Sequence, residues 1–206
     1  MQTPRRKGLA VADRASHLWL WLTAGLGLAL DLATKYLGWN FLGGPPESGG
    51  REITVIPEWL RLVASRNPGI VFGINFGDSL GIGPVAGRLM TVALTLATSG
   101  LIFYVFAVSR PRQRWLHVWC GLILAGAFGN LYDRLLFGYV RDLIQITAHG
   151  TLGSLVLQWP YVFNVADVYL VVGVIAVALA YLAGHGPDRA GAEDAPDAKE
   201  ASRERP

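Results

Sequence analysis

Four stretches of the sequence are predominantly apolar over about 20 residues, the length that an α-helix needs to cross the hydrocarbon core of a bilayer. They cover residues 18–37, 89–108, 116–137 and 165–182. In three of them the polar residues lie toward one end. This pattern predicts an all-α integral membrane protein with four transmembrane helices.

The segment 38–83, between the first two stretches, has a different pattern. Apolar residues alternate with other residues in short runs, bounded by Gly and Pro turns at 43–46 and 67–69. Alternation with a period of two is typical of β-strands. The apolar members of these runs are Ile53, Val55, Leu60, Leu62, Ile70 and Phe72. We therefore expect a small extracytoplasmic β-sheet platform in this first outer loop.

Composition agrees with a membrane protein. Hydrophobic residues make up 52% of the 206 residues and charged residues 16%, and the mean hydropathy is +0.36. A soluble domain usually has a larger charged share, about 25%. The composition therefore argues against an ordinary soluble domain.

Basic residues predict the orientation, because Lys and Arg near the ends of spans tend to stay in the cytoplasm. They gather before the first stretch and between the second and third, at Arg5, Arg6, Lys7, Arg14, Arg110, Arg112 and Arg114. Both termini are then cytoplasmic. We expect residues 1–184 to form a single membrane domain and residues 185–206, rich in charged residues, Ala, Gly and Pro, to form a disordered cytoplasmic tail. The first stretch is too long for a cleavable signal peptide and has no small-residue cleavage site after it.

Polar residues at the outer ends of the stretches are candidates for function. A charged group at the edge of the hydrocarbon region is costly and usually faces the protein interior or a water-filled cavity. The helical rise of about 1.5 Å per residue places Asp31 about 20 Å from the inner end of the first stretch. The other members are Asn130, Asp133, Arg134 and Asp167, and Asp142 lies in the outer segment 138–161. We therefore expect an active site near the extracytoplasmic face.

Several kinds of catalytic site lack their residues in this sequence. Cys120 is the only cysteine, and its position inside the third stretch favours a buried apolar role. No metal-ligand spacing is found among His17, His117, His149 and His185, so no metal is expected. No G-x-S-x-G motif occurs, and Lys35 has a helix partner in Asp31. Asp142 and Asp167 remain as a pair of carboxylates, and two close carboxylates share one proton, as in aspartic proteases.

Each candidate also has a structural interpretation. Asn164 and Asp167 have the spacing of an N-cap and its N3 partner, so their role could be only to cap the last helix. Asn130 shares one side of a helix with Asp133 and Arg134, a pattern that also fits a polar lock between helices. Asp31 and Lys35 are expected to be a structural pair. We interpret as packing contacts Gly25, Gly27, Gly121, Gly126 and Gly129.

Two other classes of function are open from the residues alone. A proton-coupled transporter or channel subunit also uses intramembrane carboxylates, but here the carboxylates gather at one face and no internal repeat is apparent. A purely structural assembly factor would leave the pairing of Asp142 with Asp167 unexplained. An enzyme is the interpretation that uses both.

Five sequence blocks occur in an order and topology that resemble a known family. They cover residues 31–35 (DLATK), 67–73 (NPGIVFG), 125–134 (AGAFGNLYDR), 140–142 (VRD) and 163–167 (FNVAD). Together they resemble lipoprotein signal peptidase, also called signal peptidase II. This is a bacterial inner-membrane aspartyl peptidase that removes the signal peptide before a lipid-modified cysteine.

The resemblance implies roles for these residues. Asp142 and Asp167 would form the catalytic dyad. The residues that would support the dyad or bind the peptide are Asn67, Gly69, Asn130, Arg134 and Asn164, and the structural polar residues would be Asp31, Lys35 and Asp133. The resemblance implies no metal or organic cofactor.

The resemblance also implies partners. The substrates would be diacylglyceryl-modified prolipoproteins, held in membrane lipid, and cyclic peptide antibiotics of the globomycin type would block the site. No nucleic-acid partner is expected, and the protein is expected to act as a monomer. Departures from the family pattern are Ile70 and Val71, where small residues are usual, Leu143 after the first aspartate, and a longer segment between Asp142 and Asp167 that includes 149–153.

Overall fold

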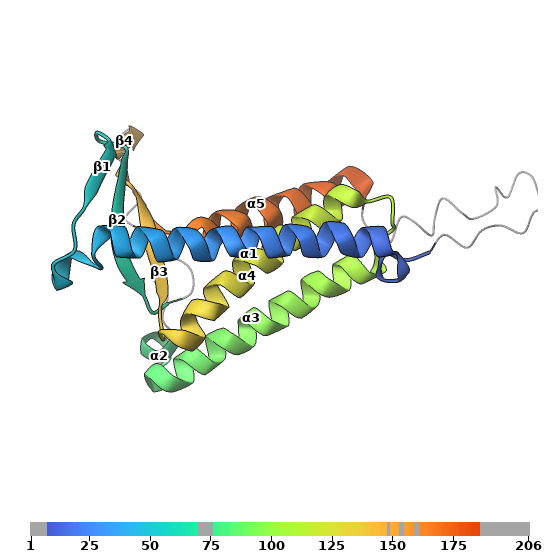
Figure 1. Cartoon of the computed structure of the whole chain (residues 1–206), viewed down its shortest axis with the longest axis horizontal. Helices are drawn as coiled ribbons and strands as arrows, with labels where there is room; N and C mark the ends of the chain where they lie inside the picture. Colours follow the sequence, from blue (N-terminus) through green and yellow to red (C-terminus); the bar gives the residue numbers. More distant parts are fainter. Residues whose placement is uncertain (1–7, 70–75, 148, 153–154, 159–160, 186–206) are drawn as a thin grey trace, which may run out of the picture.

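The structure is a computed structural model that describes residues 8–69, 76–147, 149–152, 155–158 and 161–185. Long helices run together as an elongated bundle, and a β-sheet lies across one end of it (Figure 1). The long helices are α1 (Arg14–Leu42), α3 (Gly83–Val108), α4 (Arg114–Leu136) and α5 (Val165–Ala180), and the short helical segments are η1 (Ala10–Ala12), η2 (Pro46–Ser48), α2 (Phe76–Ser79) and η3 (Tyr181–His185). The predicted tail after residue 185 lies outside the described residues.

Three helices in the described part of the chain are long and apolar enough to cross a membrane, namely Gly83–Val108, Arg114–Leu136 and Val165–Ala183. They correspond to the second, third and fourth predicted stretches, which confirms those three by length and composition. α1 covers the first stretch, but Asp31 and Lys35 lower its hydropathy, and it is not among the three. That α1 crosses the membrane stays a prediction.

α1 is longer than its apolar stretch because a local cap stabilises each of its ends. The Asp13 carboxylate accepts a hydrogen bond from the Ser16 backbone N–H at 2.7 Å, which satisfies one of the free amides of the first turn. At the other end Gly43 has φ of +76°, a left-handed conformation that costs glycine little. The helix therefore extends over 29 residues.

α4 is the central helix, with α1, α3 and α5 packed against it. A Cβ atom on Gly121 would lie 2.6 Å from the Leu20 carbonyl oxygen of α1, and one on Gly126 would lie 2.5 Å from the Ala166 carbonyl oxygen of α5. Glycine thus allows the close helix contacts that are common in membranes. The packing interpretation is confirmed for these glycines, but it is wrong for Gly25, which has no atom within 4 Å of its Cβ position.

The sheet at the end of the bundle is antiparallel and has the strand order β1-β2-β3-β6. Its strands are β1 (Ile53–Ile56), β2 (Leu60–Asn67), β3 (Val140–Ile146) and β6 (Val162–Phe163). The segment 38–83 supplies β1 and β2, but β3 and β6 come from the segment between α4 and α5. This differs from a platform within one loop, because the free edge of β2 pairs with β3 and a longer sheet satisfies more backbone groups.

The longer segment between Asp142 and Asp167 contains a separate hairpin. Its strands are β4 (His149–Leu152) and β5 (Leu155–Gln158), paired antiparallel. Of the other departures, Ile70 and Val71 lie outside the described residues, as does Phe72. Leu143 is buried with Leu42 and Ala64 in a small core between the sheet and α1.

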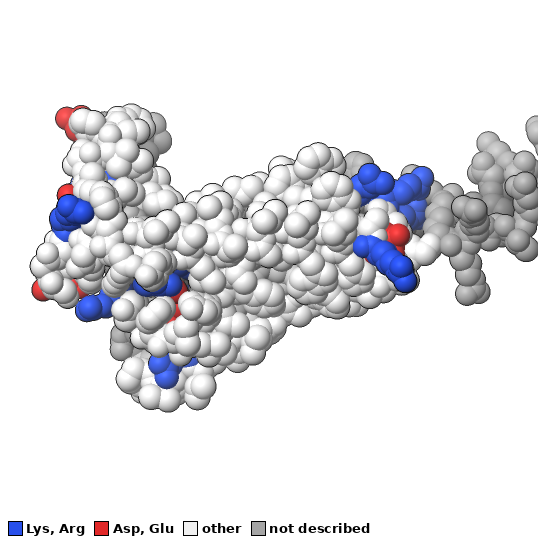
Figure 2. Space-filling view, viewed as in Figure 1, with Lys and Arg blue, Asp and Glu red and all other residues white. Residues whose placement is uncertain are grey.

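Charged side chains lie at both ends of the bundle, and at the end with the sheet basic and acidic ones are interspersed (Figure 2). The end away from the sheet has a group of basic side chains over the start of α1 and the turn between α3 and α4 (Figure 2). Basic residues in these segments are Arg14, Arg110, Arg112 and Arg114. The start of α1 and the end of α5 both lie at this end (Figure 1).

Candidate active site

The candidate site lies where the sheet meets the bundle. β3 carries Asp142, the first turn of α5 carries Asp167, and α4 carries Asn130. Antiparallel pairing of β2 with β3 places Asn67 at the same end of the sheet, opposite Val140. Residues that are far apart in the sequence are therefore brought together here.

Asp142 is the more deeply buried aspartate of the candidate pair, with 1% of its surface exposed. Asn67 Nδ2 donates to its Oδ2 at 2.9 Å, and Asn164 Nδ2 donates to its Oδ1 at 2.7 Å. Burial raises the pKa of Asp142 to about 7, and the nearby charge of Asp167 adds to the rise, while the two amide donors oppose it. Asp142 therefore keeps a proton below neutral pH.

Asp167 is less buried than Asp142 and accepts two hydrogen bonds. Asn130 Nδ2 donates to its Oδ1 at 2.8 Å, and the Asn164 backbone N–H donates to its Oδ2 at 3.0 Å. The Asp167 backbone N–H in turn donates to Asn164 Oδ1 at 3.1 Å. These reciprocal bonds form a capping box at the start of α5. The capping interpretation is correct but incomplete, because Asn164 also donates to Asp142.

Three asparagine amides direct their NH2 groups at the two aspartates, because the carbonyl oxygen of each amide already accepts a hydrogen bond from another group. Asn67 Oδ1 accepts from the Gly69 N–H at 2.9 Å, and Asn164 Oδ1 accepts from the Asp167 N–H. Asn130 Oδ1 accepts from Lys35 Nζ at 2.9 Å and from Asn164 Nδ2 at 3.2 Å. With its oxygen held, an amide has only donors left to offer. Together with the Asn164 backbone N–H, these amides give each carboxyl oxygen a donor.

A buried ionic network lies beside the aspartates. Lys35 Nζ is 2.8 Å from Asp31 Oδ2 and 3.7 Å from Asp133 Oδ2, and all three side chains are fully buried. Asp31 Oδ1 also accepts from the Ala166 backbone N–H at 2.9 Å. Buried charges persist only when they are paired and hydrogen-bonded. The network thus ties α1 to α4 and to the first turn of α5.

Arg141 belongs to this network, although the sequence pattern does not single it out. Its Nη2 atom is 2.7 Å from Asp133 Oδ1, and its backbone N–H donates to Asp133 Oδ2 at 2.9 Å. Side chains alternate across a strand, so Arg141 and Asp142 point to opposite faces of β3. In the sequence, only this alternation indicates that Arg141 faces away from Asp142 and has a bracing role.

Arg134 connects α4 to the turn after β2. Its Nη2 donates to the Gly69 carbonyl oxygen at 2.8 Å, and its Nη1 donates to the Asn130 carbonyl oxygen at 3.4 Å. Its Nε has no hydrogen-bond partner among the described residues. The contacts of Arg134 and Asn130 therefore include those of a lock between segments, and both residues also lie beside the aspartate pair.

The chemistry open to this arrangement is acid–base chemistry on water. Asp142 holds a proton near neutral pH, and Asp167 is held by amide donors without a cation of its own among the described ion pairs. A protonated and an ionised carboxyl side by side can give and take a proton in one step. Among the described residues, no group of three or more His, Cys, Asp or Glu side chains is arranged as a metal ligand set.

Comparisons with known proteins agree with one another. A family model described as Signal peptidase (SPase) II matches residues 23–183. The lipoprotein signal peptidase of Chlorobaculum tepidum is 35% identical over 162 residues, which cover 77% of this chain and 91% of that protein. The lipoprotein signal peptidase of Desulfitobacterium hafniense is 36% identical and covers 75% of this chain and 87% of its own length.

Solved structures show the same likeness. A bacterial membrane enzyme determined by the in meso method at 2.3 Å resolution superposes with a TM-score of 0.60 and 29% identity, over 78% of this chain and 85% of that one. A second, determined at 1.9 Å, gives a TM-score of 0.58 and 29% identity, over 78% of this chain and 90% of that one.

Proposed function

The chain belongs to the signal peptidase II family, and on this premise we propose that it is an aspartic endopeptidase that cleaves prolipoproteins before a diacylglyceryl-modified cysteine. The observation that best supports this is the pair of Asp142 and Asp167, both bonded by Asn164, with the pKa of Asp142 near 7. Aspartic proteases use one protonated and one ionised carboxyl group. The pair lies at the end of the bundle, beside the sheet, where such a substrate would leave the bilayer.

The proposed reaction begins with Asp167 as the base and Asp142 as the acid. Asp167 takes a proton from water, and the water oxygen attacks the carbonyl carbon of the scissile bond. Asp142 gives its proton to the carbonyl oxygen, which forms a neutral tetrahedral intermediate. Collapse of the intermediate returns the carbonyl proton to Asp142 and passes the Asp167 proton to the leaving amine, so both aspartates regain their starting states.

The neighbouring residues are assigned supporting roles. Asn67, Asn130 and Asn164 hold the carboxyl groups in place through their amide donors. Gly69 presents its carbonyl oxygen to Arg134, which fixes the turn that carries Asn67. Preorganised groups of this kind need no rearrangement when the reaction occurs.

The lipid on the substrate supplies orientation. The acyl chains of the diacylglyceryl group stay in the bilayer, and the peptide bond before the modified cysteine then lies at the bilayer edge, beside the aspartates. Holding a reacting group in position lowers the entropic cost of reaction. Cyclic peptide antibiotics of the globomycin type are proposed to bind at the same place and to block the site.

The orientation that we propose has both termini in the cytoplasm and the aspartates at the extracytoplasmic side of the bacterial inner membrane. It is supported by the basic group at the end of the bundle away from the sheet (Figure 2) and by the tendency of Lys and Arg to stay inside. It requires α1 to cross the membrane with the three apolar helices. We propose that the protein works as a monomer.

The experiment that tests this function measures cleavage of a diacylglyceryl-modified prolipoprotein in detergent or membranes. We expect Asp142→Asn and Asp167→Asn each to lower kcat by more than about 100-fold, because each variant removes one partner of the proton transfer. Asp13→Asn is the matched control, since it lies at the other end of the bundle and asparagine also caps helices.

Folding of each variant is checked by its elution as a single species and by its melting temperature. If both folded aspartate variants still cleave at a rate close to that of the unchanged protein, the proposed mechanism is wrong. If Asp13→Asn is equally inactive, the loss has another cause than the removal of a catalytic carboxylate.

A further inference from the structure

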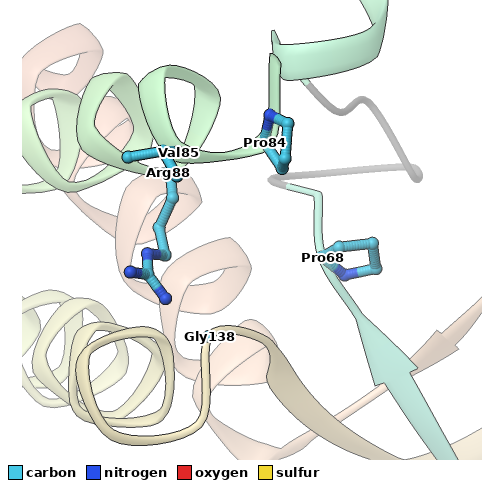
Figure 3. A pocket seen from close by; sticks show the side chains of 5 residues that line it. All are labelled: Pro68, Pro84, Val85, Arg88 and Gly138. Carbon is cyan, nitrogen blue, oxygen red and sulfur yellow. The ribbon is translucent and has the colours of Figure 1, made fainter.

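A cavity of about 170 Å³ lies next to the candidate site (Figure 3). Three segments enclose it: the turn after β2, the first turns of α3, and the turn between α4 and β3. Its lining residues are Pro68, Pro84, Val85, Arg88 and Gly138. The described part of the wall is thus mainly apolar and includes one charged group, that of Arg88.

Arg88 extends from α3 toward Gly138, as Figure 3 shows. A Cβ atom on Gly138 would lie 3.0 Å from Arg88 Nη1, and Gly138 has φ of +83°. Glycine at this turn therefore leaves the space that the guanidinium group uses. None of the ion pairs between described side chains includes Arg88, and a guanidinium group carries five N–H donors in one plane.

The pocket shares a wall with the aspartate site. Pro68 stands between Asn67, which donates to Asp142, and Gly69, which accepts from Arg134. An extended chain covers roughly 3.3–3.6 Å per residue. A substrate bound at Asp142 therefore has to cover only a short distance to reach the pocket.

The pocket also opens toward lipid. On α3, Val85 of the pocket lining and nearby Leu89 are 65% and 63% exposed, and α3 is one of the three apolar helices. Arginine near the end of such a helix keeps its charged group at the boundary between hydrocarbon and water. If α3 crosses the membrane, the ester and phosphate oxygens of lipids lie at this boundary and can accept hydrogen bonds from Arg88.

We propose that this pocket binds the glyceryl diester of the modified cysteine, with the Arg88 guanidinium donating to the ester carbonyl oxygens. Arg88 is then a residue that determines specificity for the lipid group. The proposal rests on the function proposed above, in which the peptide lies at the aspartates and the acyl chains stay in the bilayer. The glyceryl diester joins those two parts and passes between them.

The size of the pocket agrees with this ligand. A protein cavity of about 150 Å³ holds one benzene molecule, so the pocket accepts a glyceryl ester but not whole acyl chains. Pro68, Pro84 and Val85 offer apolar contacts to the glycerol carbons, and Arg88 offers several donors in one plane. A phosphate group of a neighbouring phospholipid is the competing ligand, and the experiment separates the two.

The test compares two substrates with the same peptide. One carries the diacylglyceryl group, and the other carries a dialkylglyceryl group in which ether links replace the esters and remove the carbonyl oxygens. We expect Arg88→Gln to raise KM for the diester about tenfold with kcat within twofold, because hydrogen bonds from a charged donor are lost. For the diether, KM should be the same in Arg88→Gln as in the unchanged protein.

Arg61→Gln is the matched control, because Arg61 is also on the outer side but is paired with Glu52 at 2.9 Å. Its KM for the diester should stay unchanged. The proposal is overturned if Arg88→Gln leaves KM for the diester unchanged, or if it raises KM equally for diester and diether. It is also overturned if the effect is present in phosphatidylcholine nanodiscs and absent in digalactosyldiacylglycerol nanodiscs, whose lipid has no phosphate, since that result assigns the pocket to a phospholipid phosphate.

Arg88 is exposed, so the variant is expected to fold, and its melting temperature checks this. Failure of the pocket proposal is distinct from failure of the proposed function. If the unchanged protein does not cleave the diester substrate at all, the function is wrong. If it cleaves and Arg88→Gln behaves like the unchanged protein, only the pocket assignment is wrong.

Discussion

Lys35 Nζ donates to Asn130 Oδ1 at 2.9 Å, and this bond sets the direction in which the Asn130 amide faces. An ammonium group has three donors and no acceptor, so it can hold only the oxygen of the amide. Asn130 Nδ2 is then directed to Asp167 Oδ1 at 2.8 Å. A buried lysine on α1 thus controls a hydrogen bond of an aspartate on α5.

The first prediction concerns this link. The double variant Asp31→Asn/Lys35→Met removes both charges of the ion pair, so neither charge is left buried without its partner. We expect kcat to fall about tenfold or more, because Asp167 loses the amide donor that holds its carboxylate in position. The measurement is kcat for a diacylglyceryl-modified prolipoprotein.

Lys35→Arg is the control for that double variant, since arginine also offers only donors and keeps a cation beside Asp31 and Asn130. Its kcat should be close to that of the unchanged protein. A folded double variant with an unchanged kcat would show that Lys35 does not orient Asn130.

The second prediction concerns activity against pH. Because burial raises the pKa of Asp142 to about 7, the proton that the acid must donate is lost above that pH. We expect kcat/KM to fall roughly tenfold per pH unit well above pH 7, and to fall again in acid as the base becomes protonated. A rate measured from pH 4 to pH 10 gives this bell-shaped curve, whose limits belong to the pair. A rate that stays constant from pH 6 to pH 10 contradicts the assignment.

The third prediction concerns stability against pH. In the folded protein the pKa of Asp142 is about 7, above its ordinary value of 3.8. Between these values the folded state holds a proton that the unfolded chain releases, so stability falls as pH rises through this window. Asp142→Asn has no such proton. We therefore expect the melting temperature of Asp142→Asn, relative to the unchanged protein, to be higher at pH 8 than at pH 4 by roughly 5 °C or more.

Asparagine has one acceptor fewer than aspartate for the neighbouring amides, and this changes the stability at every pH. Comparing the two pH values cancels this constant effect. Asp13→Asn again serves as the control and should show no such gain at pH 8. An equal difference in melting temperature at both pH values would mean that Asp142 is not buried as a titrating acid.

The fourth prediction concerns the contact between α4 and α5. A Cβ atom on Gly126 would lie 2.5 Å from the Ala166 carbonyl oxygen. Gly126→Ala therefore pushes α5, which carries Asp167, away from α4. We expect a loss of stability of about 1–3 kcal/mol, seen as a lower melting temperature, together with lower activity. Gly100→Ala is the matched control, because the space around Gly100 is open, and it should be neutral in both measurements.

Much of the membrane architecture is visible in the sequence, because a helix in lipid satisfies its own backbone and needs a long apolar surface. The stretches 89–108, 116–137 and 165–182 therefore predict α3, α4 and α5. The ends of α1 are not visible in this way, since Asp13 and Gly43 act through local backbone bonds and not through hydropathy. The alternating pattern predicts the strands β1 and β2 but not their pairing with β3, because that pairing joins two loops that are far apart in the chain.

The sequence indicates which residues form the candidate site, but it does not indicate how their side chains are arranged. A costly carboxylate at a membrane edge marks Asp167, and the lack of residues for other catalytic sites pairs it with Asp142 in the outer segment. The tertiary structure alone decided the orientation of the three asparagine amides, the pairing of Arg141 with Asp133, and the pocket around Arg88. The physical reason is that these features depend on contacts between distant segments, and a hydrogen bond requires a geometry that no local pattern encodes.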